Sequence, residues 1–504
     1  MQSRPLVKPD PAPHVPEVID TAGIGGHPKG LSNLFFAEMW ERFSFYGMRA
    51  ILMIFMVTSV DQGGLGFDQT NAAWVYGNYT MACYLLCILG GYLADNFVGA
   101  KRTVAVGGLI ITCGHYILAI DALPAFYSGL ALVAIGTGLL KPNISTLVGG
   151  LYSPNDRRRD AGFSLFYMGI NLGAFMSPLI TGWLAQSETF RSLLTSWGLN
   201  PNSSWHWGFG AAALGMTAGM IIYLRRLSWL GTIGEPPTKD SPRPWGQLLV
   251  VTTTTLLLLV LIGNAEAWPW APWAVAGVGI IKFAHLTSLL RPTERPRMGA
   301  IIVFFTSAVA FWALFEQAGS TLALFAEQLT HNEVGGVGFP SSWFQSANAL
   351  FVLLLAPIFA WAWVKLGDYE PSVPVKFALG LFFLGLSFIL MVPAAQATID
   401  GRVSPLWLLG VYFLQTIGEM CLSPVGLSTM TKLAPARLGG MVMGIWFLAG
   451  ALGNKLAGSL AAGYTGTDAE QLANFFLNQG LVVGGLTVAL FAIAPWVRRL
   501  MDKK

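Results

Sequence analysis

Apolar segments long enough to cross a bilayer recur along nearly the whole of this 504-residue chain. An α-helix needs about 20 predominantly apolar residues to cross the hydrocarbon core. Hydrophobic residues make up 54% of the chain and charged residues only 11%, where a soluble domain carries about 25%. The sequence therefore predicts an all-α membrane protein. The predicted spans are 33–59, 71–95, 103–121, 124–150, 161–187, 206–226, 246–263, 268–290, 299–327, 342–366, 373–395, 404–433, 438–463 and 472–497.

The spans and loops divide the chain into four parts. Residues 1–30 are rich in proline and are expected to form a flexible leader. Residues 31–226 and 298–504 each hold six predicted spans. Between them, residues 227–297 hold a basic linker and an additional two-span hairpin, which brings the total to fourteen. We expect the hairpin to be peripheral to a central site, because its one acid, Glu266, falls at a turn predicted on the outer side.

Basic residues are distributed unevenly between alternate loops. If the leader is cytoplasmic, the inside segments hold clusters such as Lys101 with Arg102, residues 157–159 and the tail, whereas the outside loops hold Arg191 and Arg402. This asymmetry follows the positive-inside rule and predicts that both termini are cytoplasmic. Orientation in a membrane also accounts for the net charge of +4, so the composition requires no nucleic-acid partner.

The first predicted span carries charged side chains where charge is expensive. An ionisable residue inside a span costs free energy unless it is paired or reached by water, so it indicates a functional site. Six side chains of this span fall within roughly 140° of arc at 100° per residue. We therefore expect this face to line a polar cavity. The six are Glu38, Glu41, Arg42, Phe45, Tyr46 and Arg49.

Two six-span halves joined by a basic segment are typical of major facilitator transporters, whose site lies at the interface of the halves. The loop after the second span supports this fold. Gly91–Asp95 (GYLAD), followed by Gly99–Arg102 (GAKR), resembles the facilitator signature GxLaD…G.(K/R)(K/R). The sequence thus predicts a major facilitator fold of two six-helix bundles with an added hairpin.

Three sequence features resemble one family within that class. Glu38–Gly47 (EMWERFSFYG) resembles the signature ExxERFxYYG, with Phe45 in place of its first tyrosine. Gly162–Ala174 resembles the second signature, FSxFYMxINxG, and Lys141 and Glu419 match its charged positions. The chain is identified as a member of the proton-dependent oligopeptide transporter (POT/PTR) family, bacterial type. Gly77 stands where animal relatives have a histidine, so histidine cannot couple protons there.

The resemblance implies a proton-coupled symporter that imports di- and tripeptides by alternating access. It implies a bacterial inner-membrane protein that works as a monomer among lipids, with protons as the co-transported ion and with no cofactor or metal. The proton-coupling positions are Glu38, Glu41, Arg42, Lys141 and Glu316. The peptide-binding positions are Arg42, Tyr46, Tyr84, Lys141, Asn171, Trp312, Glu316, Asn348, Glu419 and Trp446. Arg49 and Glu316 match a pair that closes the outer side.

The residues support a peptide site on physical grounds as well. A zwitterionic peptide needs a cationic and an anionic pole in one cavity, which Arg42 with Lys141 and Glu419 can supply. Simpler interpretations remain. Glu38 and Arg42 could form a purely structural pair at i, i+4, and Trp312 and Trp446 could serve packing alone. His115 and the four cysteines are interpreted as packing residues, with the histidine satisfied in the core.

Two other functions compete with peptide import. A member of the same family could carry nitrate or another small anionic or drug-like solute, but such a site would not need Glu419. A membrane enzyme or an ATP-driven pump would need a nucleophile, a metal cluster or a phosphate-binding loop. The sequence contains neither HExxH nor GxxxxGK[ST], so we predict that the protein is not an enzyme.

Overall fold

The computed structural model describes residues 20–153, 156–237, 243–268, 270–292, 294–434, 439–466 and 468–502. These residues are almost entirely helical, and ten of their helical segments are long and apolar enough to span a membrane. The helices are α1 (Lys29–Val57), α2 (Gln69–Leu93), α3 (Ala100–Leu118), α4 (Leu123–Gly150), α5 (Arg159–Gln186), α6 (Glu188–Ser196), α7 (Ser204–Arg225), α8 (Trp245–Gly263), α9 (Ala271–Ser288), α10 (Arg295–Phe315), α11 (Thr321–Leu329), α12 (Gln345–Leu366), α13 (Val373–Gln396), α14 (Leu406–Leu433), α15 (Gly439–Ala461) and α16 (Ala469–Asp502).

Each predicted span other than 299–327 coincides with one helix, so the prediction of an all-helical membrane protein is confirmed. The count of fourteen spans stays a prediction, because α1, α3, α9 and α15 are not among the ten apolar segments. The predicted span 299–327 is interrupted. A 3-10 turn, Glu316–Gly319, separates α10 from α11, and Ser320 leaves helical geometry at φ −127° and ψ −86°. The break puts Glu316 at a helix end.

Two elements of the loops were not predicted. Helix α6 lies in a predicted outer loop, and its first turn is capped by Ser187, whose Oγ accepts a hydrogen bond from the Phe190 amide at 3.3 Å. Strands β1 (Glu333–Val334) and β2 (Val337–Gly338) form an antiparallel hairpin. Its turn is made by Gly335 and Gly336, whose φ values of 62° and 83° suit glycine.

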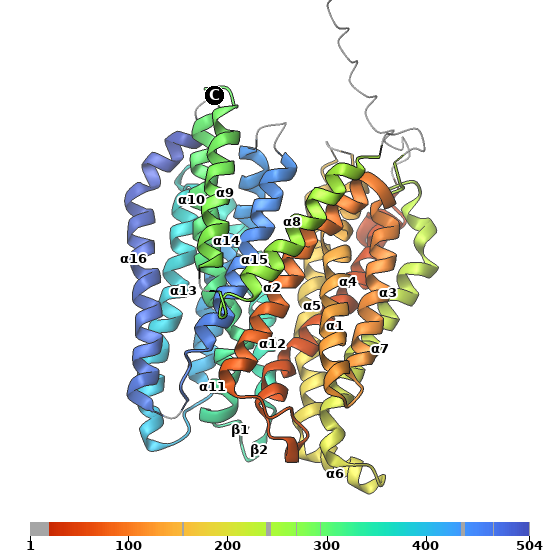
Figure 1. Cartoon of the computed structure of the whole chain (residues 1–504), viewed down its shortest axis with the longest axis vertical. Coiled ribbons are helices and arrows are strands. Elements are labelled where there is room, and N and C mark those ends of the chain that lie inside the picture. Colours follow the sequence, from red (N-terminus) through yellow and green to blue (C-terminus); the bar gives the residue numbers. More distant parts are fainter. Residues whose placement is uncertain are drawn as a thin grey trace, which may run out of the picture.

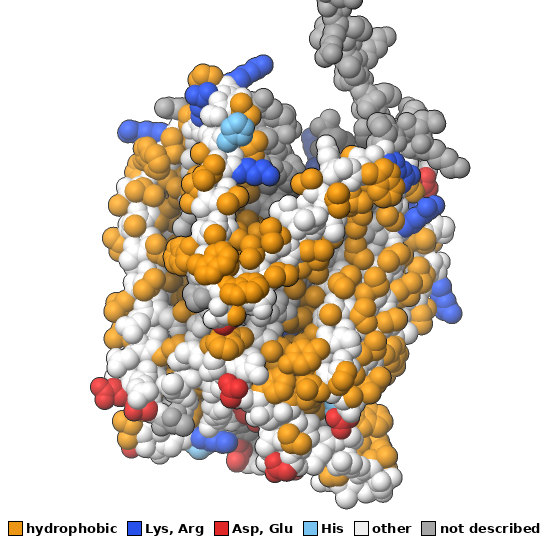
Figure 2. Space-filling model, viewed as in Figure 1, with side chains coloured by type: hydrophobic (Ala, Val, Ile, Leu, Met, Phe, Trp, Pro, Cys, Tyr) orange, Lys and Arg blue, Asp and Glu red, His pale blue; other side chains and the backbone are white. Residues whose placement is uncertain are grey.

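The helices form two bundles that lie side by side. One contains α1 to α5 and α7, and the other contains α10 and α12 to α16 (Figure 1). We call the end with Lys29 and the C-terminus the terminal end, and the opposite end, with α6 and the β-hairpin, the loop end. On the face shown in Figure 2, apolar side chains cover the middle, basic ones gather near the terminal end and acidic ones near the loop end.

Helices α2 and α15 pack along each other between the bundles. They approach most closely at two glycines, since a Cβ added to Gly77 would lie 2.8 Å from the Cα of Gly458. Close helix contact through small residues is typical of membrane proteins. There is consequently no room in this arrangement for a side chain at residue 77.

The two bundles are joined at the loop end by hydrogen bonds and an ion pair. Arg49 of α1 pairs with Glu316 at the end of α10. Gln69 of α2 donates to the Tyr464 carbonyl oxygen at 2.6 Å, and Gln186 of α5 donates to Glu327 at 3.0 Å. The structure is therefore a conformation that is closed at the loop end.

The additional hairpin, α8 and α9, lies against the bundles where α2 and α15 meet (Figure 1). Its turn lies about midway along the molecule and not at the loop end (Figure 1). Glu266, in that turn, pairs with Lys455 of α15, with Oε1 and Nζ 2.6 Å apart. Glu266 therefore lies in a turn, as predicted, but this turn does not reach the loop end (Figure 1), and its place on the outer side of a membrane stays a prediction. The turn packs against the bundles instead, because it offers a carboxylate to a lysine within a helix.

Candidate functional site

The charged face of α1 forms one compact cluster. Arg42 Nε lies 3.1 Å from Glu38 Oε1, at i, i+4 on the helix, and it also pairs with Glu41. All three side chains are buried, with 3% or less of Glu38, Glu41 and Arg42 exposed. The Arg42 guanidinium also lies over Phe45, with Cζ 5.2 Å from the ring centroid. The helix spanning 29–57 thus brings three of the five predicted coupling residues together on its own, while Lys141 lies on α4 and Glu316 follows α10.

Each member of this cluster keeps one buried polar atom without a hydrogen-bond partner among the described residues. These atoms are Glu38 Oε2, Glu41 Oε1 and Arg42 Nη2. Buried polar groups in native structures are nearly always satisfied, and an exception calls for an explanation. Two spare carboxylate oxygens can accept protons, and one spare guanidinium donor can accept an anion. The cluster has the parts of a site that exchanges a proton and a carboxylate.

Lys141 adds a second cation from another helix. Its Nζ lies 3.7 Å from the ring centroid of Tyr84 on α2, a cation–π contact. Lys141 also lies near Glu38, and Tyr84 and Tyr46 lie near Arg42. Three helices of the first bundle therefore converge on one positively charged region. We call Arg42, Lys141, Tyr46 and Tyr84 the basic pole.

An acidic region lies on the second bundle. Asn348 of α12 donates a hydrogen bond to Glu419 Oε2 of α14 at 3.1 Å, and to Thr416 Oγ1 at 3.0 Å. Glu419 is partly exposed, and Tyr167 of α5 in the first bundle lies near it. We call Glu419 and Asn348 the acidic pole. Among the described residues, the hydrogen-bond partner of Glu419 is a neutral amide.

Asn171, another predicted peptide-binding residue, sits next to Tyr167 on α5. It is buried, and its Nδ2 donates to the Tyr167 carbonyl oxygen at 2.9 Å, within its own helix. Tyr167 was not singled out from the sequence, although it belongs to the second signature. Its position within the segment FSLFYM of that signature could have marked it as a candidate site residue. The structure shows that α5 brings this tyrosine toward the acidic pole of the opposite bundle.

The pairing of Arg49 with Glu316 that the sequence predicts is present, and it has a third member. The Tyr76 hydroxyl of α2 accepts a hydrogen bond from Arg49 Nε at 2.5 Å. Gly319 makes space for that hydroxyl, since an added Cβ would lie 1.8 Å from Tyr76 Oη. Tyr76 was not singled out from the sequence, because no motif marks it and its role depends on where α2 meets α1 and the turn Glu316–Gly319. The pair's role in gating stays a prediction.

The two tryptophans assigned to the site contact glycines of the second bundle. A Cβ on Gly453 would lie 2.4 Å from Trp312 Cβ, and one on Gly426 would lie 2.3 Å from the Trp446 ring. Both tryptophans are nevertheless partly exposed. They therefore have a packing role, and contact with a peptide stays a prediction.

Two sequence interpretations are corrected by the structure. His115 is fully buried on α3, but neither of its ring nitrogens has a hydrogen-bond partner among the described residues, so it is not a satisfied core histidine. Cys113 is exposed on the same helix, so it does not pack in a core as Cys83, Cys87 and Cys421 do. The periodicity of α3 could not separate its lipid-facing side from its buried side, because both are apolar.

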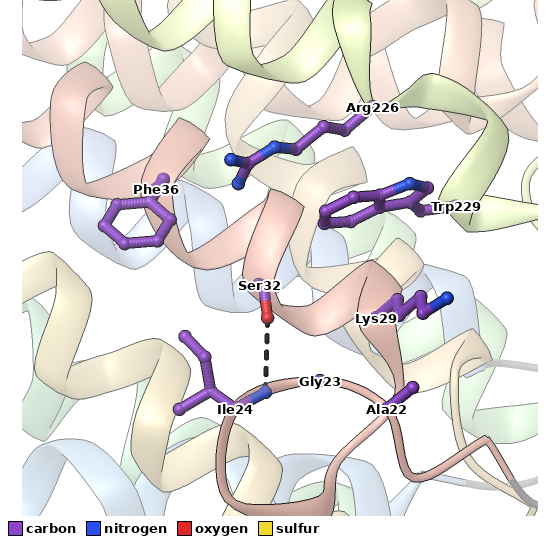
Figure 3. Close-up of a pocket in the computed structure, with 8 residues that line it drawn as sticks. All are labelled: Ala22, Gly23, Ile24, Lys29, Ser32, Phe36, Arg226 and Trp229. Carbon is purple, nitrogen blue, oxygen red and sulfur yellow. Dashed lines mark hydrogen bonds between the residues drawn. The ribbon is translucent and has the colours of Figure 1, made fainter.

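A separate cavity of about 310 Å³ lies at the terminal end, beside the start of α1. Its wall includes Lys29, Arg226 and Trp229, and the guanidinium of Arg226 lies over Trp229 with Cζ 4.8 Å from the ring centroid (Figure 3). Ser32 Oγ accepts a hydrogen bond from the Ile24 amide at 3.4 Å, which holds the preceding segment there. The cavity shares no residue with either pole.

Opposite charged poles on two helical bundles, with closure at one end, define a multi-pass membrane transporter. The sequence profile of the POT family matches residues 101–474, so the chain belongs to the POT family. The family identification made from the motifs is thereby confirmed, as is the prediction of a transporter in place of an enzyme.

Relatives and solved structures agree over nearly the whole chain. The transporter YclF of Bacillus subtilis is 41% identical and the peptide transporter YePEPT of Yersinia enterocolitica 37%; each comparison covers 95% of this chain and 96% of the relative. A crystal structure of a mutant of a peptide transporter named POT, in complex with alafosfalin, is 40% identical. It superposes with a TM-score of 0.84 over 96% of this chain and 98% of that chain.

Proposed function

We propose that this protein is a proton-coupled importer of di- and tripeptides. The observation that carries the proposal is the separation of charge between the bundles, with Arg42 and Lys141 on one and Glu419 on the other. A free peptide carries a carboxylate at one end and an ammonium at the other, so it can bridge the two poles. The names of the relatives, which include peptide and di-/tripeptide transporters, support this cargo.

The proposed orientation places the terminal end in the cytoplasm of a bacterium and the loop end outside the inner membrane. The excess of basic residues near the terminal end supports it, since such residues favour the cytoplasmic side (Figure 2). Fourteen spans of a major facilitator arrangement, acting as a monomer, complete the proposal. In this orientation the structure is closed to the outside, with Arg49 and Glu316 paired.

Proton coupling is assigned to the α1 cluster. When Arg42 pairs with Glu38 and Glu41, both carboxylates are favoured in their charged form. When a peptide carboxylate engages Arg42, the guanidinium is shared and a carboxylate can hold a proton in place of the cation. Peptide and proton then bind together, because Arg42 is the shared partner of Glu38, Glu41 and the peptide carboxylate. This exchange gives symport without a cofactor.

The test is uptake of a labelled dipeptide into proteoliposomes with an imposed pH gradient. We expect accumulation above equilibrium that stops when a protonophore collapses the gradient. Nitrate in excess is the control for an anion carrier and should not compete. If nitrate displaces the dipeptide and is itself accumulated, the cargo assignment is wrong. If the dipeptide only equilibrates at every gradient, the coupling is wrong.

A further inference from the structure

Lys455 is a buried lysine within helix α15, and none of the assignments above uses it. Its side chain is 4% exposed, yet it lies six residues from the loop-end terminus of α15, about 9 Å at 1.5 Å per residue. An ionisable group at such a position is costly unless it is paired. The sequence analysis overlooked Lys455, although a lysine inside the predicted span 438–463 was a sufficient signal.

The partners of Lys455 come from two other parts of the chain. Its Nζ donates to Glu266 Oε1 of the hairpin turn at 2.6 Å and to Asn78 Oδ1 of α2 at 2.8 Å, and it lies 3.5 Å from the Gly263 carbonyl oxygen. The Asn78 amide in turn donates to Gly263 at 2.9 Å. We call Lys455, Glu266 and Asn78 the lysine junction. It joins the first bundle, the second bundle and the hairpin at one ammonium group.

The lysine junction is enclosed by apolar packing. Leu258, Leu259 and Ile262 of α8 pack against helices α2 and α15. The α2 and α15 partners in this cluster are Met81, Tyr84, Leu85, Ile88, Leu448, Ala451 and Leu452. The low polarity of this shell strengthens the ion pair and makes an unpaired Lys455 costly. The hairpin therefore supplies both the counter-charge and the cover for a lysine that joins the bundles.

Three consecutive residues of α2 connect the lysine junction to closure of the loop end. Tyr76 accepts a hydrogen bond from Arg49 of the closing pair, Gly77 contacts Gly458 of α15, and Asn78 accepts from Lys455. If the two bundles separate at the loop end, α2 moves away from α15 near these residues. The closing pair and the lysine junction must then be lost together, because they are attached to adjacent residues of one helix.

On the basis of the alternating-access function above, we propose that the lysine junction is a second latch of the loop-end-closed state, through which the hairpin takes part in the transport cycle. Lys455 is a positioning residue in this scheme, since it touches neither pole. Glu266 and the hairpin hold the ammonium against Asn78 while the loop end is closed. Under this proposal the hairpin takes part in transport, contrary to the expectation from the sequence that it is peripheral.

The test measures the distance between the bundles at the loop end. Spin labels at Ser196 on the first bundle and Ile399 on the second, both exposed, would be introduced after the four cysteines are replaced by alanine. We expect Lys455→Met to raise the population with a long interlabel distance by about tenfold, since it removes a buried charged donor. Glu266→Gln should have a smaller effect, because Asn78 still accepts from Lys455.

A matched control is available in the second bundle. Lys376 is also buried, and it pairs with Glu370 near the terminal end without reaching the first bundle. Lys376→Met should therefore leave the interlabel distances unchanged. The double variant Lys455→Glu with Glu266→Lys exchanges the two charges and should restore the closed population. If Lys455→Met acted only through a general loss of stability, the double variant would not restore it.

The outcomes separate clearly. The latch is disproved if Lys455→Met and Glu266→Gln, purified as monodisperse protein, give the distance distribution of the parent. It is also disproved if Lys376→Met shifts the distances as much as Lys455→Met. The measurement needs neither a peptide nor a pH gradient, so its failure is distinguishable from failure of the uptake assay.

Discussion

The basic and acidic poles are built differently. In the basic pole, the cation Arg42 is held by two carboxylates of its own helix, so its charge is compensated before any substrate arrives. In the acidic pole, Glu419 is held by the neutral amide of Asn348. The first bundle can thus redistribute its charges internally, which suits exchange of a proton. The second bundle offers an acid that gains an opposite charge when a cation arrives, which suits recognition of a peptide ammonium.

The largest effect should come from removing the charge exchange in the basic pole. We expect Glu38→Gln and Glu41→Gln each to abolish dipeptide accumulation under a pH gradient, because Arg42 then loses one of the carboxylates that can take up a proton. Counterflow of peptide against peptide should partly survive, since it needs no net proton movement. Accumulation by both variants at the parental level would remove the distinction between the poles. Glu188→Gln, on an exposed acid of α6, is the control.

The next largest effect should separate the two ends of the peptide. We expect Lys141→Ala and Glu419→Ala each to weaken dipeptide binding by about 10- to 100-fold, the value of a hydrogen bond to a charged group of about 1.5–3 kcal/mol. Amidation of the peptide C-terminus should then lower the affinity of the parent by a larger factor than it lowers the affinity of the Lys141→Ala variant. In the same way, N-acetylation should lower the affinity of the parent by a larger factor than that of the Glu419→Ala variant. Binding measured by calorimetry as a double-mutant cycle checks this. Full additivity in either cycle would contradict direct contact.

A smaller effect is expected at the closing pair, Arg49 with Glu316, which connects the two bundles that carry the poles. Tyr76→Phe removes the hydroxyl that accepts from Arg49 but leaves the ion pair with Glu316, so loop-end closure should weaken by about 3- to 10-fold. Accessibility of a cysteine label at the loop end reports this change. Tyr127→Phe, on an exposed tyrosine of α4, should have no effect. An equal response of both variants would show that Tyr76 is not part of the gate.

The smallest effect concerns the family departure at residue 45. Phe45 is buried, and its ring lies against the Arg42 guanidinium. Because a tyrosine ring makes the same cation–π contact, we expect Phe45→Tyr to change KM for a dipeptide by less than about threefold. Uptake at several dipeptide concentrations measures it. A change above tenfold would mean that the missing hydroxyl shapes this basic pole.

The sequence predicted the helices well and the contacts between them unevenly. Apolar length located the long helices, and the i, i+4 spacing of Glu38 and Arg42 was enough to raise the possibility of their pairing, because both residues lie on one helix. The residues that were missed depend on two helices meeting. Tyr76 acquires its role from Arg49 of α1 and from the turn after α10, and Lys455 acquires its partners from α2 and from a turn almost two hundred residues away. No periodicity within one segment encodes such a distance.

The sequence by itself determined the class of the protein, because a helix that crosses a membrane must satisfy its backbone internally and must be apolar along its length. It also determined the family, since the charged signature of α1 is contiguous. The tertiary structure decided which end is closed, where α10 breaks and what the hairpin touches. These features rest on side chains from separate helices that meet at a few points, such as Gly77 against Gly458. Packing in three dimensions fixes where these side chains meet. Many helices share the same apolar composition, so only the way in which two helices cross determines which residues come into contact.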